Sequence, residues 1–141
     1  MKKTKYVVSY IFDENNTKVL LIKKKRPTFL VGKMTGIGGH VENFDETHYH
    51  AIQREINEES NLNIPIDKIH LIDSICAEEY TLDVFAIIAE EKEISNFKNN
   101  IDEEQNWFNI EDIKSKKLDI QYAYGTYEAI IYIHENFDKF K

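Results

Sequence analysis

Three glutamates, Glu55, Glu58 and Glu59, lie close together in the segment Arg-Glu-Ile-Asn-Glu-Glu at residues 54–59. If the segment is helical, spacings of three and four residues put the three carboxylates on one face. Such like charges repel one another and destabilise a helix by roughly a few tenths of a kcal/mol per pair. A divalent cation would offset the repulsion, because Mg²⁺ takes carboxylate and phosphate oxygens as ligands. The alternative is an ordinary solvated helix face.

A glycine-rich stretch precedes these glutamates. Four of the five glycines, Gly32, Gly36, Gly38 and Gly39, fall within residues 29–39. Glycine lets a backbone approach a ligand closely, and the Gly39 carbonyl is therefore a candidate metal ligand. Bare backbone beside a helix that carries carboxylates predicts a metal-dependent site for a diphosphate.

The glutamates are expected to lie on a helix over residues 47–61. Thr47 is a suitable N-cap, and Asn61 can adopt the left-handed conformation that ends a helix. Pro65 prevents the helix from continuing.

Strands and helices alternate along the rest of the chain. Runs of β-branched and aromatic residues predict strands at residues 6–12, 18–23, 69–75, 81–89 and 107–109. The first two are expected to form a hairpin, and residues 29–39 a loop. A helical turn is predicted at residues 110–113 and a helix at residues 122–137. This order predicts one layered α/β domain over residues 1–141.

Composition narrows the classes of function. The chain has 141 residues, with 25 acidic and 18 basic side chains and a net charge of −7. Broad binding to a nucleic-acid backbone is therefore not expected. No apolar run approaches the roughly 18 residues needed to span a membrane, so no membrane partner is expected. The only cysteine is Cys76, which is typical of a cytoplasmic protein.

Residues 39–62 resemble the signature of the Nudix hydrolases. In that family a glycine is followed, after five residues, by a glutamate, and after seven more by Arg-Glu-aliphatic-x-Glu-Glu-x-Gly-aliphatic. Seven residues separate Glu46 from Arg54, so the register agrees from Glu46 onward. Six residues lie between Gly39 and Glu46, which indicates one inserted residue in the loop 42–46.

A competing register uses Asp45 as the acid, but it leaves Gln53 at the arginine position, and we reject it. Asn61 replaces the family glycine. The run Gly32–Gly39 is similar to the MutT-like branch of the family. The resemblance implies an α/β/α sandwich with a mixed, curved β-sheet between helices.

The resemblance also implies roles for the side chains. Glu55, Glu58 and Glu59 would bind Mg²⁺, or Mn²⁺, with the Gly39 carbonyl, and Arg54 would orient a glutamate. Glu46 would pair with Arg54 or support the metal ligands from outside. A general base is expected either among the glutamates of the motif or in the loop before Trp107. Between the two loop residues Glu103 and Glu104, the sequence position favours Glu104, with an ordinary solvated loop as the alternative.

Candidate substrate-binding residues surround the motif. They are Arg26, Lys33, Gly38, His40 and Trp107. The basic run that ends at Arg26 could instead be a solvated face, and Trp107 could pack in the core rather than stack on a base.

The expected function is that of a MutT-like nucleoside triphosphate pyrophosphohydrolase. It would convert an ordinary or oxidised nucleoside triphosphate into the monophosphate and pyrophosphate. The alternatives are hydrolysis of ADP-ribose or of a dinucleoside polyphosphate, and a non-catalytic module that binds nucleotides. The expected partner is a small nucleotide, and a homodimer is expected by analogy with relatives.

Overall fold

Strand β1 (Thr4–Asp13) runs through the middle of the sheet in the computed structural model, which describes residues 3–99 and 102–141. In these residues eight strands form one sheet in the order β5-β6-β1-β2-β3-β8, with β4 paired to β1 and β7 to β2. The pairs β1–β6 and β3–β8 are parallel and the others antiparallel, so the sheet is mixed. The remaining strands are β2 (Lys18–Lys23), β3 (Lys33–Thr35), β4 (Ile37–His40), β5 (Ile69–Cys76), β6 (Tyr80–Ala89), β7 (Gln105–Asn109) and β8 (Gln121–Tyr122).

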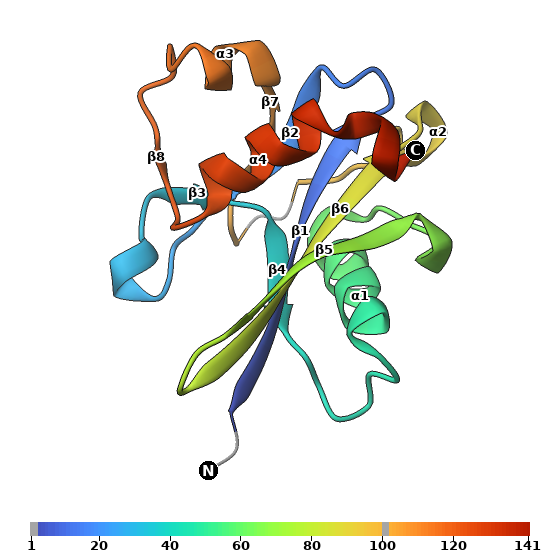
Figure 1. Cartoon of the computed structure of the whole chain (residues 1–141), viewed down its shortest axis with the longest axis vertical. Helices are drawn as coiled ribbons and strands as arrows, with labels where there is room; N and C mark the ends of the chain where they lie inside the picture. Colours follow the sequence, from blue (N-terminus) through green and yellow to red (C-terminus); the bar gives the residue numbers. More distant parts are fainter. Residues whose placement is uncertain (1–2, 100–101) are drawn as a thin grey trace.

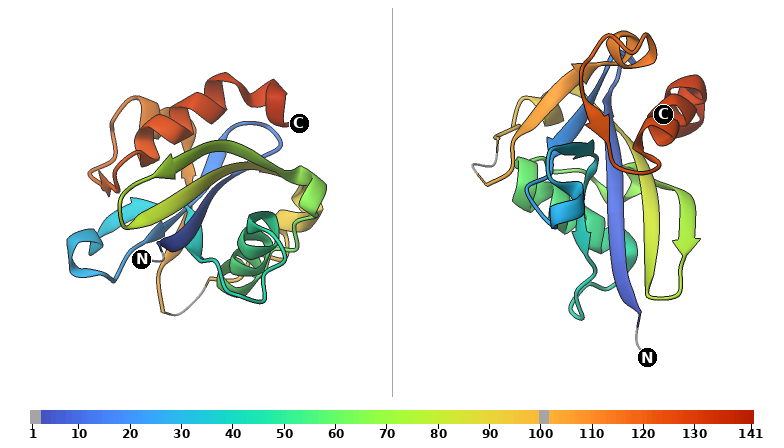
Figure 2. Two further views of the ribbon diagram at one scale, coloured as in Figure 1. Left: turned by 60° about the horizontal axis from the view of Figure 1, so that its bottom comes forward. Right: turned by 90° about the vertical axis from the view of Figure 1, so that its left-hand side faces the viewer.

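Helices cover both faces of the sheet. Figure 2 shows α1 (His48–Ser60) on one face and α4 (Thr126–Glu135) on the other, as the resemblance implied. The shorter helical segments are α2 (Glu91–Ile94), α3 (Ile110–Lys114) and the 3₁₀ turns Thr28–Leu30, Ile66–Lys68 and Phe137–Phe140. Within the described residues, no helix is long and apolar enough to cross a membrane.

Successive side chains of β1 point to opposite faces of the sheet, and the core therefore consists of two layers. Val7 and Ile11 face α1 and pack with Ile52 and Ile56, while Tyr10 and other side chains of opposite parity face α4. The predicted hairpin of β1 and β2 is confirmed, with Ile11 opposite Leu20. The α1 layer thereby fixes the helix that carries the glutamates.

Two predictions about elements were wrong in part. Residues 29–39, expected to be a loop, contain β3 and β4 as well as the first 3₁₀ turn. Both strands are short, β4 contains two glycines and β3 lies between Gly32 and Gly36, so neither shows the usual run of β-branched and aromatic residues. The C-terminal helix begins at Thr126 rather than at residue 122, because Gly125 adopts a φ of 84° and Tyr122 lies on β8.

Candidate active site

Helix α1 is fixed at both ends as the sequence predicted. The Thr47 side chain accepts a hydrogen bond from the His50 N–H, and Asn61 ends the helix at a φ of 63°. Ala51 and Ile52 are fully buried against the sheet. Glu55 and Glu58 therefore lie toward β4 and Arg54, and Glu59 lies toward the loop before β7.

Glu55 lies directly against Gly39 on β4. A Cβ added to Gly39 would lie 2.6 Å from Glu55 Cδ and 2.7 Å from each of its carboxylate oxygens. Burial raises the pKa of Glu55; hydrogen bonding and charge from Arg54 oppose this effect, and the net shift is upward. Only glycine at residue 39 leaves room for this carboxylate beside the backbone.

Arg54 joins the helix to the loop before it. Its Nε and one terminal nitrogen donate to the two carboxylate oxygens of Asp45, at 3.0 and 2.8 Å. The terminal nitrogen that binds Asp45 also donates to the His40 carbonyl, at 3.1 Å. The other terminal nitrogen lies 3.0 Å from Glu55 Oε1 and 3.3 Å from Glu58 Oε2. Such a two-point guanidinium–carboxylate contact fixes orientation as well as charge.

The structure corrects the predicted partner of Arg54. The Asp45 side chain is only 4% exposed and pairs with Arg54, whereas the Glu46 side chain is 83% exposed and its recorded partner is His50 at 4.0 Å. Asp45 also accepts from the Glu42 N–H, which holds the loop in place. Arg54 thus pairs with the acid of the register that was rejected from the sequence; with Asp45 as the acid, the extra residue would lie between Asp45 and Arg54.

Glu59 faces a different set of charges. Burial raises its pKa most, the negative charge of Glu103 raises it further, and Lys24 lowers it. Glu103 is itself buried, accepts from the Lys25 N–H at 2.7 Å and lies 3.4 Å from Lys24 Nζ. The loop residue brought near the helix is thus Glu103, and not Glu104 as predicted. Glu104 is exposed, and its carboxylate accepts from Asn106.

The three glutamates of α1 do not meet at one point. Glu58 is drawn to Arg54, while Glu59 lies near Glu103. In the described residues, no three His, Cys, Asp or Glu side chains are grouped closely enough to hold a metal ion. Their chemistry nevertheless fits a hard divalent cation, because the donors are all oxygens and two of the carboxylates, Glu55 and Glu59, are partly buried with raised pKa values.

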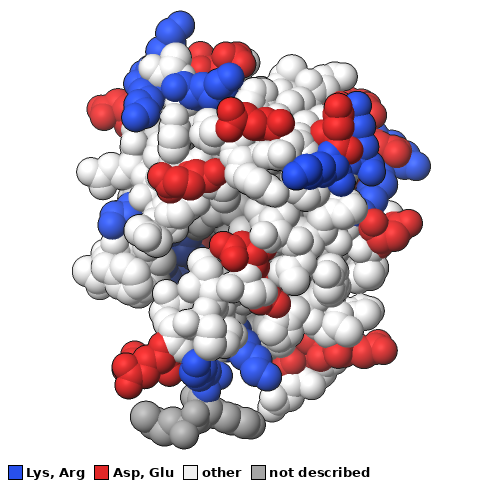
Figure 3. All heavy atoms as spheres, viewed as in Figure 1, with Lys and Arg blue, Asp and Glu red and all other residues white. Residues whose placement is uncertain are grey.

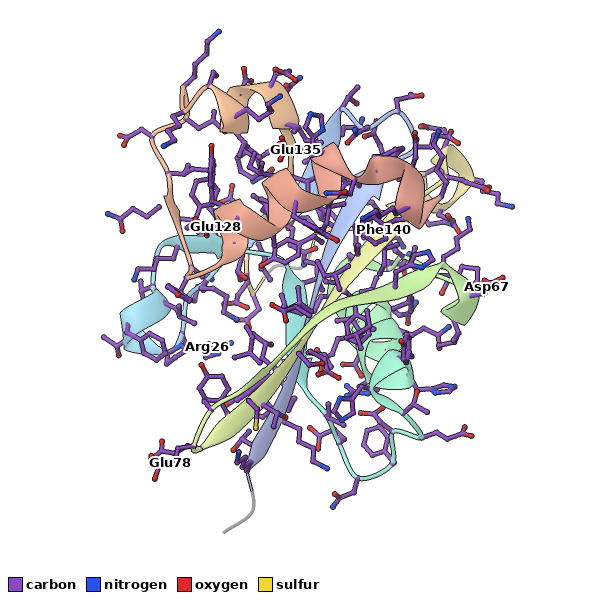
Figure 4. All side chains as sticks on the ribbon, in the orientation of Figure 1. Arg26, Asp67, Glu78, Glu128, Glu135 and Phe140 are labelled. Carbon is purple, nitrogen blue, oxygen red and sulfur yellow. The ribbon has the colours of Figure 1, made fainter. Side chains whose placement is uncertain are left out.

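The predicted phosphate contacts lie on neighbouring segments. Figure 4 labels Arg26 on the segment between β2 and β3, where its guanidinium pairs with Asp102. Lys33 begins β3 and is half-buried. Gly38 has a packing role, because an added Cβ would lie 2.0 Å from the Val7 carbonyl oxygen.

The two aromatic candidates differ in exposure. The His40 ring is exposed and lies 4.7 Å from the Tyr6 ring, while its carbonyl binds Arg54. Trp107 packs edge-on against Phe97 in the core layer under α1. Of the two roles considered for Trp107, this contact fits packing in the core.

A separate cleft of about 1120 Å³ opens on the α4 side of the sheet. The carboxylates of Asp73 and Glu128 lie on its wall. Tyrosines form much of the rest: Tyr10, Tyr122, Tyr124, Tyr127 and Tyr132. In Figure 3 much of the middle of this face is uncharged, although a few acidic and basic side chains also show there, and further charged side chains lie around it. Such walls suit a flat, aromatic ligand.

Sequence reasoning included Lys24 only in the basic run that ends at Arg26, and it did not identify this cleft; it favoured Glu46 over Asp45 and Glu104 over Glu103. The five residues between Gly39 and Asp45 are a signal that could have identified Asp45. Glu103 and Lys24 are 79 positions apart, so their contact had no local signal.

A model of the NUDIX domain matches residues 2–128 of the chain. Comparison with curated proteins gave no match. The solved structures that resemble the chain include one from work on MutT of Aliivibrio salmonicida and Vibrio cholerae, with a TM-score of 0.76, 18% identity and coverage of 96% of this chain and 100% of that one.

Two further structures have similar folds. The NUDIX domain of Shewanella oneidensis NrtR, solved with ADP ribose, has a TM-score of 0.72 and 15% identity over 97% of this chain and 90% of that one. A MutT/nudix protein from Enterococcus faecalis has a TM-score of 0.66 and 22% identity, over 77% of this chain and 44% of that one. The chain thus spans less than half of the Enterococcus protein.

Proposed function

Because the chain belongs to the NUDIX domain family, we propose that it hydrolyses pyrophosphate bonds in nucleotides with the help of Mg²⁺ or Mn²⁺. The proposed substrate is an ordinary or oxidised nucleoside triphosphate, and the products are the monophosphate and pyrophosphate. The MutT neighbour supports this choice, because the similarity extends over the full length of that protein.

The observation that carries the proposal is the pair of partly buried carboxylates on α1. Burial and neighbouring negative charges raise the pKa values of Glu55 and Glu59, so the ionised pair is costly without a cation. Gly39 leaves the backbone open beside Glu55. A purely structural helix would gain nothing from this arrangement.

Each group then has a defined task. The carboxylates of Glu55, Glu58 and Glu59 and the Gly39 carbonyl would hold the metal. When bound, the metal neutralises phosphate oxygens and makes a water molecule more acidic. Arg54, fixed by Asp45, orients Glu55 and Glu58 through its own hydrogen bonds.

Water attacks a phosphorus, and the bond from that phosphorus to the bridging oxygen breaks. Glu103 is proposed to accept the proton of the water, because its charge acts on Glu59 and its backbone contact with Lys25 fixes it. Glu104, the earlier choice, lacks such contacts with α1 among those recorded.

The aromatic cleft is the proposed site for the nucleoside. Its tyrosines offer stacking surfaces, and the carboxylates of Asp73 and Glu128 can accept hydrogen bonds from base N–H groups. Glu128 is labelled on α4 in Figure 4.

ADP-ribose is the second candidate substrate, since the Shewanella domain of similar fold was solved with ADP ribose. A dinucleoside polyphosphate is a further alternative of the same reaction type. A non-catalytic module that binds nucleotides has less support, because all three motif glutamates are present.

The test is a screen for phosphate and pyrophosphate release with Mg²⁺. It covers ordinary and oxidised nucleoside triphosphates, ADP-ribose and dinucleoside polyphosphates. One triphosphate should release pyrophosphate, and Glu59→Gln should lower kcat by about 1000-fold because a metal ligand is lost. Glu135→Gln, an exposed site on α4, is the matched control and should retain full activity.

Turnover of ADP-ribose alone would support the proposed active site but would make ADP-ribose the substrate instead of a nucleoside triphosphate. No turnover of any compound, with Mn²⁺ still bound, would favour the binding module.

A further inference from the structure

Lys24 extends from the end of β2 toward carboxylates that come from two distant parts of the chain. Its Nζ lies 3.4 Å from Glu103 Oε1, and its positive charge lowers the pKa of Glu59. The Lys24 side chain is 24% exposed and that of Glu103 is 10% exposed, so solvent screens this pair only in part. Lys24 therefore supplies positive charge where α1 meets the loop before β7.

The neighbouring basic residues make contacts of a different kind. The Lys25 backbone N–H donates to Glu103 Oε2 at 2.7 Å. Movement of the Lys25 side chain cannot break this hydrogen bond. The Arg26 guanidinium pairs with Asp102. The Lys24 contact depends on a side chain alone and is long for a hydrogen bond. Lys24 thus contacts Glu103 through a side-chain cation, whereas Lys25 contacts it through the backbone and Arg26 binds a different carboxylate. The Lys24 ammonium can therefore leave Glu103 while the backbone contact stays in place.

The backbone at Lys24 is nevertheless fixed. Its N–H donates to the Lys33 carbonyl at 2.9 Å, and its carbonyl accepts from the Gly32 N–H at 2.8 Å. A lysine carries its charge on a flexible four-carbon stem. The ammonium can therefore move while the strand end stays in place.

We propose that Lys24 is an exchangeable counterion of the site. In the metal-free protein its ammonium balances Glu59 and Glu103. When a divalent metal binds at Glu59 together with substrate, the ammonium moves to a phosphate oxygen. The inference rests on the proposed function, because it needs a metal and a phosphate at this site.

The physical reason is competition between cations. A divalent ion held by Glu59 would repel the ammonium and would replace it as the counterion of Glu59, so that Lys24 would also leave Glu103. The incoming phosphates bring new negative charge, and lysine binds phosphate readily as a point charge. Departure of Lys24 also frees Glu103 Oε1, which is the oxygen available to receive a proton.

The first experiment measures Mn²⁺ binding without nucleotide, from the electron paramagnetic resonance signal of free Mn²⁺. Lys24→Met should bind Mn²⁺ about tenfold more tightly than the wild type, because no ammonium competes. The second measures inorganic pyrophosphate binding in the presence of Mg²⁺ by calorimetry. Here Lys24→Met should bind about tenfold more weakly, because a phosphate contact is lost. A residue that only maintained the fold would not shift the two affinities in opposite directions.

Lys23→Met is the matched control, since Lys23 is the exposed neighbour on β2 and loses the same charge. It should change neither affinity by more than about twofold. Lys24→Arg keeps the charge and should return both affinities toward the wild type.

Weaker Mn²⁺ binding by Lys24→Met would overturn the proposal, because Lys24 would then organise the carboxylates instead of competing for them. Unchanged pyrophosphate binding would overturn it as well. A wild-type protein that binds no Mn²⁺ would count against the proposed function and against this inference together. A wild type that binds Mn²⁺, with Lys24→Met unaltered, would count against Lys24 alone.

Discussion

Asp13 and Asp45 each organise a polar loop, yet their partners differ in distance along the chain. Asp13 is buried at the end of β1 and accepts hydrogen bonds from the N–H and hydroxyl of Thr17 and from the N–H of Lys18. Asp45 binds Arg54, nine residues away on α1. The first carboxylate closes a hairpin turn, whereas the second joins a loop to the helix of the candidate site.

The same contrast recurs in the loop before β7. Glu104 binds Asn106, two residues away, while Glu103 contacts Lys24 and Lys25 across the molecule. In both cases the carboxylate with distant partners lies at the candidate site, and the one with local partners serves local structure. The contrast can be tested by neutralising each member in turn.

The largest effect is expected at Glu103. Glu103→Gln keeps the size of the side chain but removes the charge that would accept a proton, so kcat should fall by about 1000-fold. Glu104→Gln should retain activity within about twofold, because its recorded partner is local. Both values come from steady-state kinetics on the substrate that the screen identifies. Equal losses in the two variants would remove the distinction between the two glutamates.

The next effect is expected at Asp45. Asp45→Asn weakens the two-point contact with Arg54, which in turn holds Glu55 and Glu58, so kcat/KM should fall by about 100-fold. Glu46→Gln, at the position that the sequence favoured, should leave kcat/KM within about twofold of the wild type. If Glu46→Gln is the more damaging change, the original register is correct after all.

These pairs indicate what could be predicted from the sequence. Local signals were sufficient for α1 with its caps at Thr47 and Asn61, for the location of the three motif glutamates on that helix and for the β1–β2 hairpin. They failed where a choice between adjacent residues depended on folding. Asp45 was rejected because it lies one residue farther from Arg54 than the acid of the family motif does. Only the folded loop before α1 shows which carboxylate reaches the Arg54 guanidinium. The strands β3 and β4 were missed because they are only three and four residues long and two of the four residues of β4 are glycines.

The adjacent glycines Gly38 and Gly39 differ in the same way, because one packs against backbone and the other against a carboxylate of the candidate site. Gly39→Ala brings a methyl group to within 2.7 Å of the Glu55 carboxylate oxygens, and that flexible side chain can move aside. Activity should fall by about 30-fold, because a metal-binding group is displaced, while thermal stability hardly changes. Gly38→Ala instead meets the Val7 carbonyl oxygen at 2.0 Å, and backbone there cannot yield easily.

Gly38→Ala should therefore lower the free energy of unfolding by about 2 kcal/mol or more, as measured by urea denaturation. A Gly39→Ala protein with full activity would show that the position of Glu55 beside β4 does not matter for the reaction.

The smallest effect is expected at Asp13, and it concerns stability alone. Burial raises the pKa of Asp13, but hydrogen bonds from Thr17 and Lys18 outweigh burial, so its net pKa lies below the ordinary value. In the unfolded chain the carboxyl titrates near about pH 3.9. The ionised native form therefore contributes stability above that pH, and the contribution is lost as the pH falls through the lower folded-state pKa.

Asp13→Asn should lower the free energy of unfolding by about 1–2 kcal/mol at pH 7, and the gap from the wild type should narrow below about pH 4. Urea denaturation at several pH values measures the gap, with Glu14→Gln in the same turn as the exposed control. Activity should be unchanged. A gap that stays constant with pH would mean that the hydrogen bonds do not depend on the charge of Asp13. Lost activity would mean that a carboxylate with purely local partners still influences the site, and the contrast with Asp45 would fail.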